Sequence, residues 1–274
     1  MEWKNDFGPV SGKPDKLLSD GGCCAIFRRI ACVGDSLSSG EFESLNEEGK
    51  KSYHDIYEQS WGQYLARMCG STVYNFSRGG MTAKEYCERF ADSQGFWNPR
   101  LAADAYIIAL GVNDLYNNAS VQSGETAIGT ADQTDPVNWR NNPGNFAGYY
   151  STIISRYKEI QPRAKFFLMT MPRETRRSQR CVEIGQEHRD LLYAFAGRDP
   201  DIEVIDLWQF APEYDDEFRK TFFLGGHMNP LGYLFTARLV ATCIDWLIRR
   251  DPTAYAEIGF IGTEYQHLKY LKTE

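Results

Sequence analysis

The sequence has few of the residues that build metal sites, and those present are scattered. Seven cysteines, at positions 23, 24, 32, 69, 87, 181 and 243, form no C-x-x-C pair, and the four histidines lie far apart. Zinc sites and disulfide frameworks depend on closer and more regular spacing. We therefore expect reduced, mostly buried thiols and no metal site.

Long apolar runs and an excess of positive charge are missing as well. The segment 231–248 comes closest to a membrane span, but Arg238 and Asp245 interrupt it. Residues 1–18 lack the apolar centre of a signal peptide. The formal net charge of −7 argues against nucleic acid or an anionic membrane as partner. We expect a soluble, cytoplasmic protein; a leader removed ahead of this sequence is the alternative.

Phosphate-binding loops of the G-x-G-x-x-G and Walker types are absent, which argues against a nucleotide binder. The chain is instead rich in core-forming residues, with 42% hydrophobic residues, 16 Tyr and 16 Phe among 274 residues. That is enough for one large domain with a sizeable core. We expect this core at about residues 28–249, after an N-terminal extension over 1–27 and before a C-terminal tail over 250–274.

Strand-like and helix-like segments alternate along the chain. The apolar run at 105–110 is typical of a strand buried on both faces. Residues 61, 64, 65 and 68 show the spacing of a helix. The same reasoning predicts strands at 30–33, 72–76, 105–110, 165–171 and 203–205, and helices at 59–68, 82–91, 146–157, 182–195 and 230–248. Five strands separated by helices predict a five-stranded parallel sheet covered on both faces, with right-handed crossovers.

Three polar or glycine positions follow predicted strands directly. They are Ser36, Gly80 and Asn113. Because the carboxyl ends of parallel strands share one edge of the sheet, we expect these residues to converge there. Two polar insertions, 41–59 and 119–142, leave the same edge. They are either walls of a pocket or solvated surface loops.

A serine hydroxyl is a poor nucleophile at neutral pH and needs a neighbouring base. His227, in the sequence Gly-Gly-His-Met-Asn-Pro just ahead of the last predicted helix, is the best base for Ser36. We interpret His54, His188 and His267 as surface residues because their neighbours are polar or charged, or because they lie in the tail.

An acyl-transfer site also needs hydrogen-bond donors aimed at the developing oxyanion. Gly80 offers an unobstructed backbone N–H, Asn113 a side-chain amide, and Ser36 its own N–H. Each alone has a plain alternative as a turn or helix cap. Asp35 and Asp114 are better interpreted as carboxylates that hold their loops by accepting backbone N–H bonds.

Four short blocks in this order resemble the SGNH hydrolases, also called the GDSL esterase/lipase family. They are Gly34-Asp35-Ser36-Leu37, residues 75–82 (NFSRGGMT), Gly111-Val112-Asn113-Asp114, and His227. The resemblance spans roughly residues 28–249. It implies a three-layer α/β/α sandwich of flavodoxin-like architecture, hydrolysis of ester bonds, and no cofactor. It also implies Ser36 and His227 as catalytic residues, with Ser36, Gly80 and Asn113 as the oxyanion hole.

One position departs from the family pattern, which usually has an aspartate three residues before the histidine. Here that position is Leu224, and its side chain can neither orient the imidazole nor stabilise its charged form. Three explanations stay open. The backbone carbonyl of Leu224 holds the ring; an acid from elsewhere, Asp206, Asp215 or Asp216, takes the place; or the protein is an enzyme of very low activity or a binding protein that has lost catalysis.

The polar insertions and the lack of a long apolar lid favour a short acyl group, such as acetate on a carbohydrate. Lysophospholipase or thioesterase activity and a non-catalytic carbohydrate-binding protein are the alternatives. Arg78, inside the second block, is the best candidate for a substrate contact; the basic stretch 173–180 either binds an acidic group or is solvated. Apolar residues of the tail suggest packing on the domain or on another subunit, which leaves a homo-oligomer open.

Overall fold

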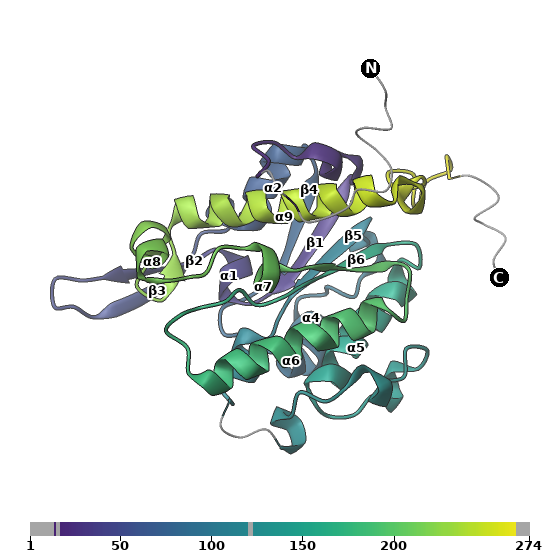
Figure 1. The fold of residues 1–274 in the computed structure, drawn as a ribbon. Helices are drawn as coiled ribbons and strands as arrows, with labels where there is room; N and C mark the ends of the chain where they lie inside the picture. Colours follow the sequence, from purple (N-terminus) through teal and green to yellow (C-terminus); the bar gives the residue numbers. More distant parts are fainter. Residues whose placement is uncertain (1–13, 15–16, 120–122, 267–274) are drawn as a thin grey trace.

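A five-stranded parallel sheet forms the centre of the molecule (Figure 1). The computed structural model describes residues 14, 17–119 and 123–266. The strand order is β4-β1-β5-β6-β7. The bounds are β1 Arg29–Gly34, β4 Thr72–Ser77, β5 Ala105–Ala109, β6 Lys165–Met169 and β7 Ile202–Ile205. The five strands predicted from the sequence are thus confirmed, each to within two residues at either end.

Helices cover both faces of the sheet, which confirms the three-layer α/β/α architecture (Figure 1). One face carries α2 and α9, and the other carries α3, α4, α5 and α6. Their bounds are α2 Trp61–Cys69, α3 Ala83–Glu85, α4 Ala91–Ser93, α5 Phe146–Ile160, α6 Gln179–Ala196 and α9 Pro230–Arg250. The predicted helix 82–91 is α3 followed by a π-helical turn, Tyr86–Phe90.

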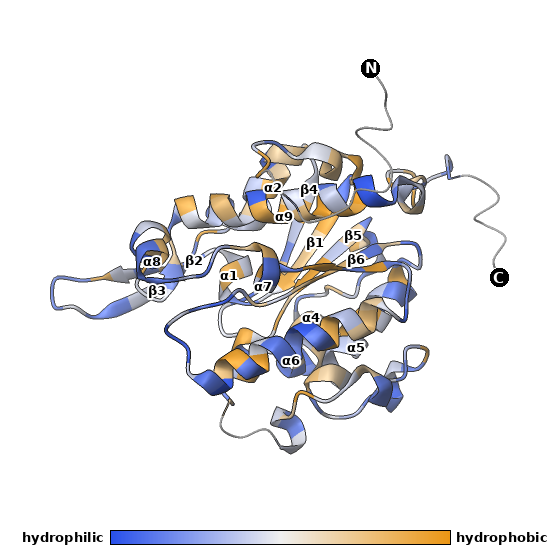
Figure 2. Cartoon of the chain, viewed as in Figure 1, coloured by the Kyte–Doolittle hydropathy of each residue, from blue (hydrophilic) through white to orange (hydrophobic). Residues whose placement is uncertain are grey.

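Side chains of β1 alternate between two cores. Ala31 and Val33 pack with α5 and α6, whereas Ile30 and Cys32 pack with α2 and α9. This is the two-residue period of a strand buried on both sides. Figure 2 shows the apolar residues of the central strands between the helical layers. α9 is apolar and long enough to cross a membrane by composition, yet most of it is buried inside the domain.

Smaller elements surround the carboxyl edge of the sheet. They are α1 Ser36–Ser39, the antiparallel hairpin β2 Glu41–Leu45 and β3 Lys51–Asp55, α7 Leu207–Phe210, α8 Asp216–Phe222, and the two-stranded ladder β8 Phe223–Leu224 and β9 His227–Met228. The remaining turns are 3-10 helices at Gly22–Ile26, Tyr57–Gln59, Pro99–Leu101, Gly124–Thr126, Ala131–Gln133, Trp139–Asn141 and Pro252–Tyr255, and a π turn at Val112–Tyr116.

The two insertions differ in structure and in position. Residues 41–59 contain the β2–β3 hairpin, which projects from the body of the domain (Figure 1). The described part of 119–142 forms 3-10 turns that pack against α5. It contributes no residue to the pocket beside Ser36 among the parts of the chain that the structure describes. Residues 41–59 do not line this pocket either, but Glu41 and Glu43 of this insertion contact His227 at the reactive edge.

The described part of the C-terminal tail folds back onto the domain. Tyr255, Ile258 and Ile261 are buried in the core under α9. Phe260 and Tyr265 are exposed, and Leu268 and Leu271 lie outside the described residues, as does His267.

Candidate active site

The strand register brings three loops of the sheet edge together. Gly34 at the end of β1 pairs with Ser77 on β4 and with Ala109 on β5. The residues that follow these strands, Ser36, Gly80 and Asn113, therefore start from neighbouring positions. This arrangement is what the alternation of strands and helices predicts.

Ser36 opens the one-turn helix α1. Asp35 caps that helix, because its carboxylate accepts the Leu37 N–H at 3.1 Å. The turn is tight: a Cβ built on Gly34 would lie 2.3 Å from the Ser38 Oγ. Glycine at position 34 therefore lets the strand turn sharply into α1, which places the Ser36 side chain at the sheet edge.

His227 stands on a short ladder beside α1. It pairs with Leu224 across β8 and β9, and Gly225, with φ +69°, takes the turn between them. Asn229 and Pro230 then start α9. α1 and β9 are neighbours, and Ser36, Asn113 and His227 line one pocket of about 160 Å³.

The pocket walls are mixed in character. An ion pair between Glu174 and Arg177, at 3.0 Å, forms one side, and the Arg177 guanidinium lies 4.6 Å from the centre of the Tyr116 ring. The other lining residues are Asp35, Leu37, Val112, Pro172, Tyr214, Phe223 and Gly226. Arg177 belongs to the basic stretch 173–180, so this stretch does reach the pocket.

The backbone donors expected for an oxyanion are available. Among the described residues, neither the Ser36 N–H nor the Gly80 N–H has a hydrogen-bond acceptor. Gly80 has φ +71°, a conformation that favours glycine. The Asn113 amide instead donates to Met81 O at 3.2 Å and to Asp35 Oδ2 at 3.4 Å. Asn113 thus ties the second and third blocks to the loop of Ser36.

Two buried carboxyls support these loops. Asp114 accepts the Ala83 N–H at 2.8 Å, and burial together with the nearby Asp35 charge raises its pKa to about 7. Burial also raises the pKa of Asp35 to about 6, although the Leu37 N–H works against that shift. Both carboxyl groups accept backbone N–H bonds and so stabilise their loops, as expected from the sequence.

The imidazole of His227 lies between two glutamates of β2. Its Nδ1 is 3.0 Å from Glu43 Oε1, and its Nε2 is 3.0 Å from Glu41 Oε1. Glu41 and Glu43 are two residues apart on one strand, so their side chains share a face of the hairpin. Tyr53 of β3 packs edge-on against the ring at 5.8 Å.

The two carboxylates differ in their surroundings. Burial alone would raise the pKa of Glu43, but hydrogen bonds from Lys51, His227 and the Gly226 N–H lower it below its usual range. For Glu41, burial raises the pKa, and the charge of His227 only partly opposes this. Glu43 therefore stays ionised more readily than Glu41.

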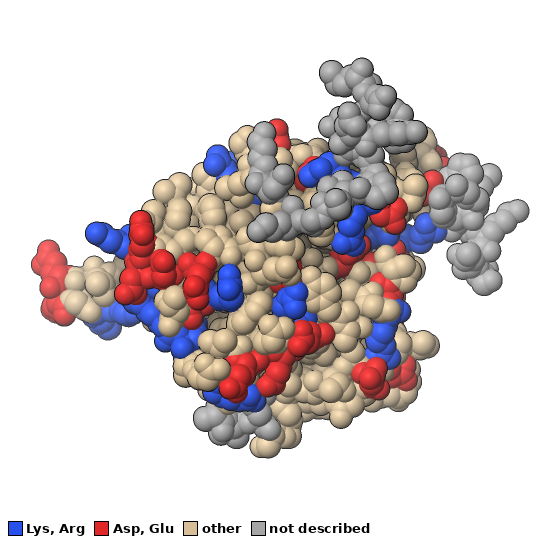
Figure 3. Space-filling model, in the orientation of Figure 1, with Lys and Arg blue, Asp and Glu red and all other residues tan. Residues whose placement is uncertain are grey.

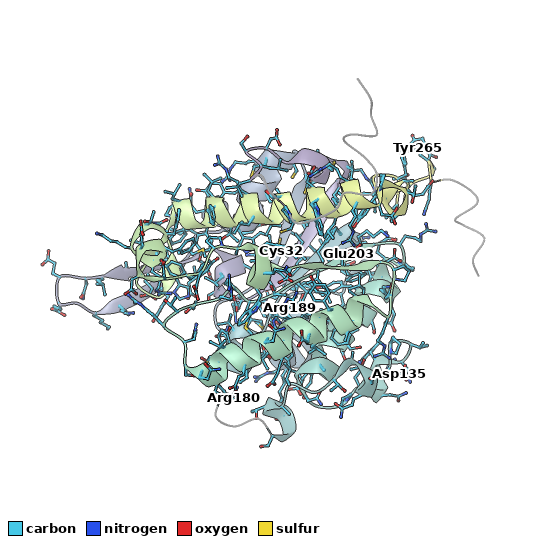
Figure 4. All side chains as sticks on the ribbon, viewed as in Figure 1. Cys32, Asp135, Arg180, Arg189, Glu203 and Tyr265 are labelled. Atoms are coloured by element: carbon cyan, nitrogen blue, oxygen red, sulfur yellow. The ribbon has the colours of Figure 1, made fainter. Side chains whose placement is uncertain are left out.

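The acids suggested by the sequence lie elsewhere, which corrects that expectation. Asp206 is buried, lies 2.8 Å from Arg189 and also accepts from Tyr193. Figure 4 labels Arg189 on α6. Asp215 caps α8, and Asp216 pairs with Arg176. The carbonyl of Leu224 is not at Nδ1 either, because Glu43 occupies that nitrogen.

Sequence reasoning missed Glu41 and Glu43. They lie in an insertion with no apolar alternation, and 184 residues separate Glu43 from His227. The one available signal was a pair of acids at alternate positions in a segment placed at the reactive edge.

Two further sequence interpretations change. Arg78 pairs with Glu85 at 2.7 Å and lies over the Phe90 ring, and it does not line the pocket formed by the described residues. His188 is buried, not exposed: a Cβ on Gly111 would lie 3.1 Å from its Nε2, and burial lowers its pKa to about 4. It packs beneath the third block because α6 turns this face toward the sheet. His54 is exposed and bonds Ser44 on the hairpin.

Comparison with known proteins adds a family and a fold. Residues 32–234 match the model of the GDSL-like Lipase/Acylhydrolase family. No curated protein sequence matches the chain.

Several solved structures share the fold. A family two carbohydrate esterase from Clostridium thermocellum, in complex with cellohexaose, aligns with TM-score 0.55 and 14% identity over 89% of this chain and 67% of that one. Est24, a carbohydrate acetylesterase from Sinorhizobium meliloti, aligns with TM-score 0.52 and 15% identity over 80% of this chain and 99% of that one. At these identities the likeness concerns the fold alone.

Proposed function

The chain belongs to the GDSL-like lipase/acylhydrolase family, and from this premise we propose that it is a serine esterase that cleaves carboxylic esters. Ser36 is the nucleophile and His227 the general base. One observation carries the proposal: a serine from near the start of the chain, a histidine from near its end and Asn113 line the same pocket.

The chemistry follows from this arrangement. The Ser36 Oγ attacks the ester carbonyl while His227 Nε2 takes the hydroxyl proton. The tetrahedral oxyanion accepts hydrogen bonds from the Ser36 and Gly80 N–H groups and from the Asn113 amide. The imidazolium then gives its proton to the departing alcohol, and water activated by His227 releases the acyl group from Ser36.

Two groups rearrange for this step. His227 Nε2 contacts Glu41 Oε1, so the Glu41 carboxylate leaves that nitrogen when Ser36 donates its proton. The Asn113 amide turns from Met81 O toward the oxyanion. The first is a 3.0 Å contact between a carboxylate and an imidazole, and the second a 3.2 Å hydrogen bond; the gain of a charge-assisted bond in the transition state offsets the loss of both.

We propose a short acyl group, such as acetate on a carbohydrate, as the substrate. The small pocket beside Ser36 supports this, as do its Glu174–Arg177 pair and Tyr116, which suit a hydroxylated leaving group. Fold relatives that are carbohydrate esterases point the same way.

A chromogenic acetyl ester tests the activity. Ser36→Ala is expected to lower kcat by about 10⁶-fold, as in other serine hydrolases. Ser93→Ala is the matched control, because Ser93 is exposed, lies outside the pocket, and bonds only its sequence neighbours Phe90 O and Gln94 among the described residues. Acetylated sugars compared with aryl esters of rising acyl length then test the substrate class. Equal turnover by Ser36→Ala and the parent protein contradicts the proposal.

A non-catalytic carbohydrate-binding protein is the second candidate. The contact between Glu41 and His227 Nε2 favours it, since this nitrogen is then closed to Ser36. A fluorophosphonate probe distinguishes the two, because it reacts only with an activated serine.

A further inference from the structure

We propose that Glu43 is the positioning residue that orients His227 through Nδ1, and that the β2–β3 hairpin thereby supplies the acid that the loop before His227 lacks. This inference rests on the proposed function of His227 as the base. It assigns a role to an insertion that the family pattern of four blocks does not include.

Three donors fix the Glu43 carboxylate. Oε1 accepts the Gly226 N–H at 2.7 Å and lies 3.0 Å from His227 Nδ1, while Oε2 pairs with Lys51 at 2.8 Å. The side chain is only 6% exposed. A carboxylate held at both oxygens has one orientation, and it passes that orientation on to the imidazole.

The glycines of the β8–β9 turn make room for this carboxylate. A Cβ on Gly225 would lie 2.3 Å from Glu43 Oε2, and a Cβ on Gly226 would lie 2.4 Å from Oε1. Any larger residue at either position displaces Glu43. The turn before His227 and the hairpin are therefore shaped to fit each other, although they are far apart in the sequence.

The tautomer of His227 decides which glutamate serves the base. A neutral imidazole has one N–H, and a base that accepts the Ser36 proton at Nε2 must carry its own proton on Nδ1. Glu43 accepts at Nδ1 and thus selects this tautomer. Glu41 faces Nε2 and competes with Ser36, so it cannot play the orienting part.

The surroundings of Leu224 explain why the acid beside His227 can come from β2 instead of from position 224. Leu224 and His227 are directly paired across a two-residue turn, so their side chains lie on one face of the ladder. In this chain Leu224 is 49% exposed, and β2 lies against β8 and β9 instead. Acidic and basic side chains gather around the base of the hairpin and α8 (Figure 3).

Glu43→Gln tests the proposal in the full-length protein. Glutamine keeps the shape but removes the charge and allows the wrong tautomer, so kcat for an acetyl ester is expected to fall by about 10³- to 10⁴-fold with little change in KM. Glu48→Gln, at the tip of the same hairpin, is the matched control. Glu48 makes no side-chain contact with His227, and its variant is expected to keep the parental kcat.

A rescue variant separates positioning from general damage to the fold. Leu224→Asp places a carboxylate beside His227 on the paired strand. In the Glu43→Gln background it is expected to restore kcat by about 10-fold or more, whereas a merely structural loss stays unrescued.

Proton NMR gives a readout that is independent of activity. An imidazole N–H bonded to a carboxylate resonates at low field. With the nitrogen assigned by ¹⁵N labelling, so that Nδ1–H is distinguished from an Nε2–H facing Glu41, the Nδ1–H signal is expected in the parent and in Glu48→Gln but not in Glu43→Gln. Parental kcat in Glu43→Gln, while Ser36→Ala is inactive, overturns the role of Glu43 and leaves the esterase standing. Full turnover by Ser36→Ala contradicts the proposed esterase function instead. The NMR signal then still reports whether Glu43 binds His227.

Discussion

At the scale of single residues, the site relies on carboxyl groups buried without a cation. Asp35 and Asp114 both lie behind the loops that present Ser36 and Asn113, and one oxygen of Asp114 has no hydrogen-bond partner among the described residues. Each group accepts a backbone N–H. These carboxyl groups hold the loops in place, but burying them is unfavourable whenever they are ionised.

Asp114 makes folding stability depend on pH. The native carboxyl holds a proton up to about pH 7, whereas the unfolded one releases it near pH 4. The native state thus binds more protons between these values, and stability falls as pH rises through that window. Asp114→Asn keeps an acceptor for Ala83 and removes this penalty. Urea unfolding should show that its stability drops less from pH 4.5 to 7.5, by on the order of 2–4 kcal/mol; an unchanged pH slope contradicts the assignment.

Asn113→Ala removes one oxyanion donor. We expect kcat for an acetyl ester to fall by about 10² to 10³ with a small change in KM, because the amide serves the transition state more than the ground state. Asn98→Ala is a suitable control, since Asn98 is exposed, accepts the Arg100 N–H at 3.0 Å and does not line the pocket formed by the described residues. A rise in KM alone, with kcat preserved, is inconsistent with an oxyanion role.

Glu41→Ala frees Nε2 of His227. In the structure this nitrogen is occupied by Glu41 Oε1, so removing the carboxylate should let Ser36 reach the base more often. We expect several-fold faster labelling of Ser36 by a fluorophosphonate probe, measured by intact-protein mass spectrometry. Slower labelling means that Glu41 assists the base rather than competing for it.

At the scale of elements, the β2–β3 hairpin is the part that sequence reasoning handled worst. The five strands and the long helices follow from apolar runs and helical spacing, as in 105–110, which is β5. The hairpin has no such signal, because every residue of β3 is exposed. Glu43 meets His227 only through the tertiary fold, and no local spacing encodes that meeting.

The same reasoning accounts for the rest of the site. Ser36, Gly80 and Asn113 were predictable as neighbours because each follows a strand of one parallel sheet. The burial of His188 was not, since its polar flanking residues face solvent while α6 turns the imidazole inward under Gly111. Which face of a helix is buried depends on the element it packs against, and the sequence of the helix does not name that element.

Gly226→Ala tests whether hairpin and turn fit together. The added Cβ would meet Glu43 Oε1 at 2.4 Å, so the carboxylate must shift away from His227. We expect kcat to fall by about 10-fold or more with a small loss of stability. Gly49→Ala is the control: Gly49 has φ +77° at the hairpin tip with nothing within 4 Å of an added Cβ. Gly49→Ala should lower the free energy of unfolding by about 1 kcal/mol at most and leave kcat unchanged. An equal loss of kcat in both variants contradicts the proposed fit between the hairpin and the β8–β9 turn.

At the scale of the whole molecule, the sheet joins two cores that support one edge. One core lies under α2 and α9, the other under α5 and α6, and the loops from β1, β4 and β5 emerge between them. α9 begins immediately after His227, so the longest helix of the described chain anchors the base. Ser36 follows β1, an interior strand whose side chains are buried on both faces of the sheet. Both reactive groups are therefore fixed by the most buried parts of the fold.

The most direct test of the account is covalent labelling of the parent protein by a fluorophosphonate, followed by peptide mass spectrometry. The account predicts a single adduct on Ser36, and its disappearance in His227→Ala, whose fold is checked by circular dichroism. An unlabelled Ser36 in the parent, or equal labelling in His227→Ala, contradicts a serine activated by this histidine.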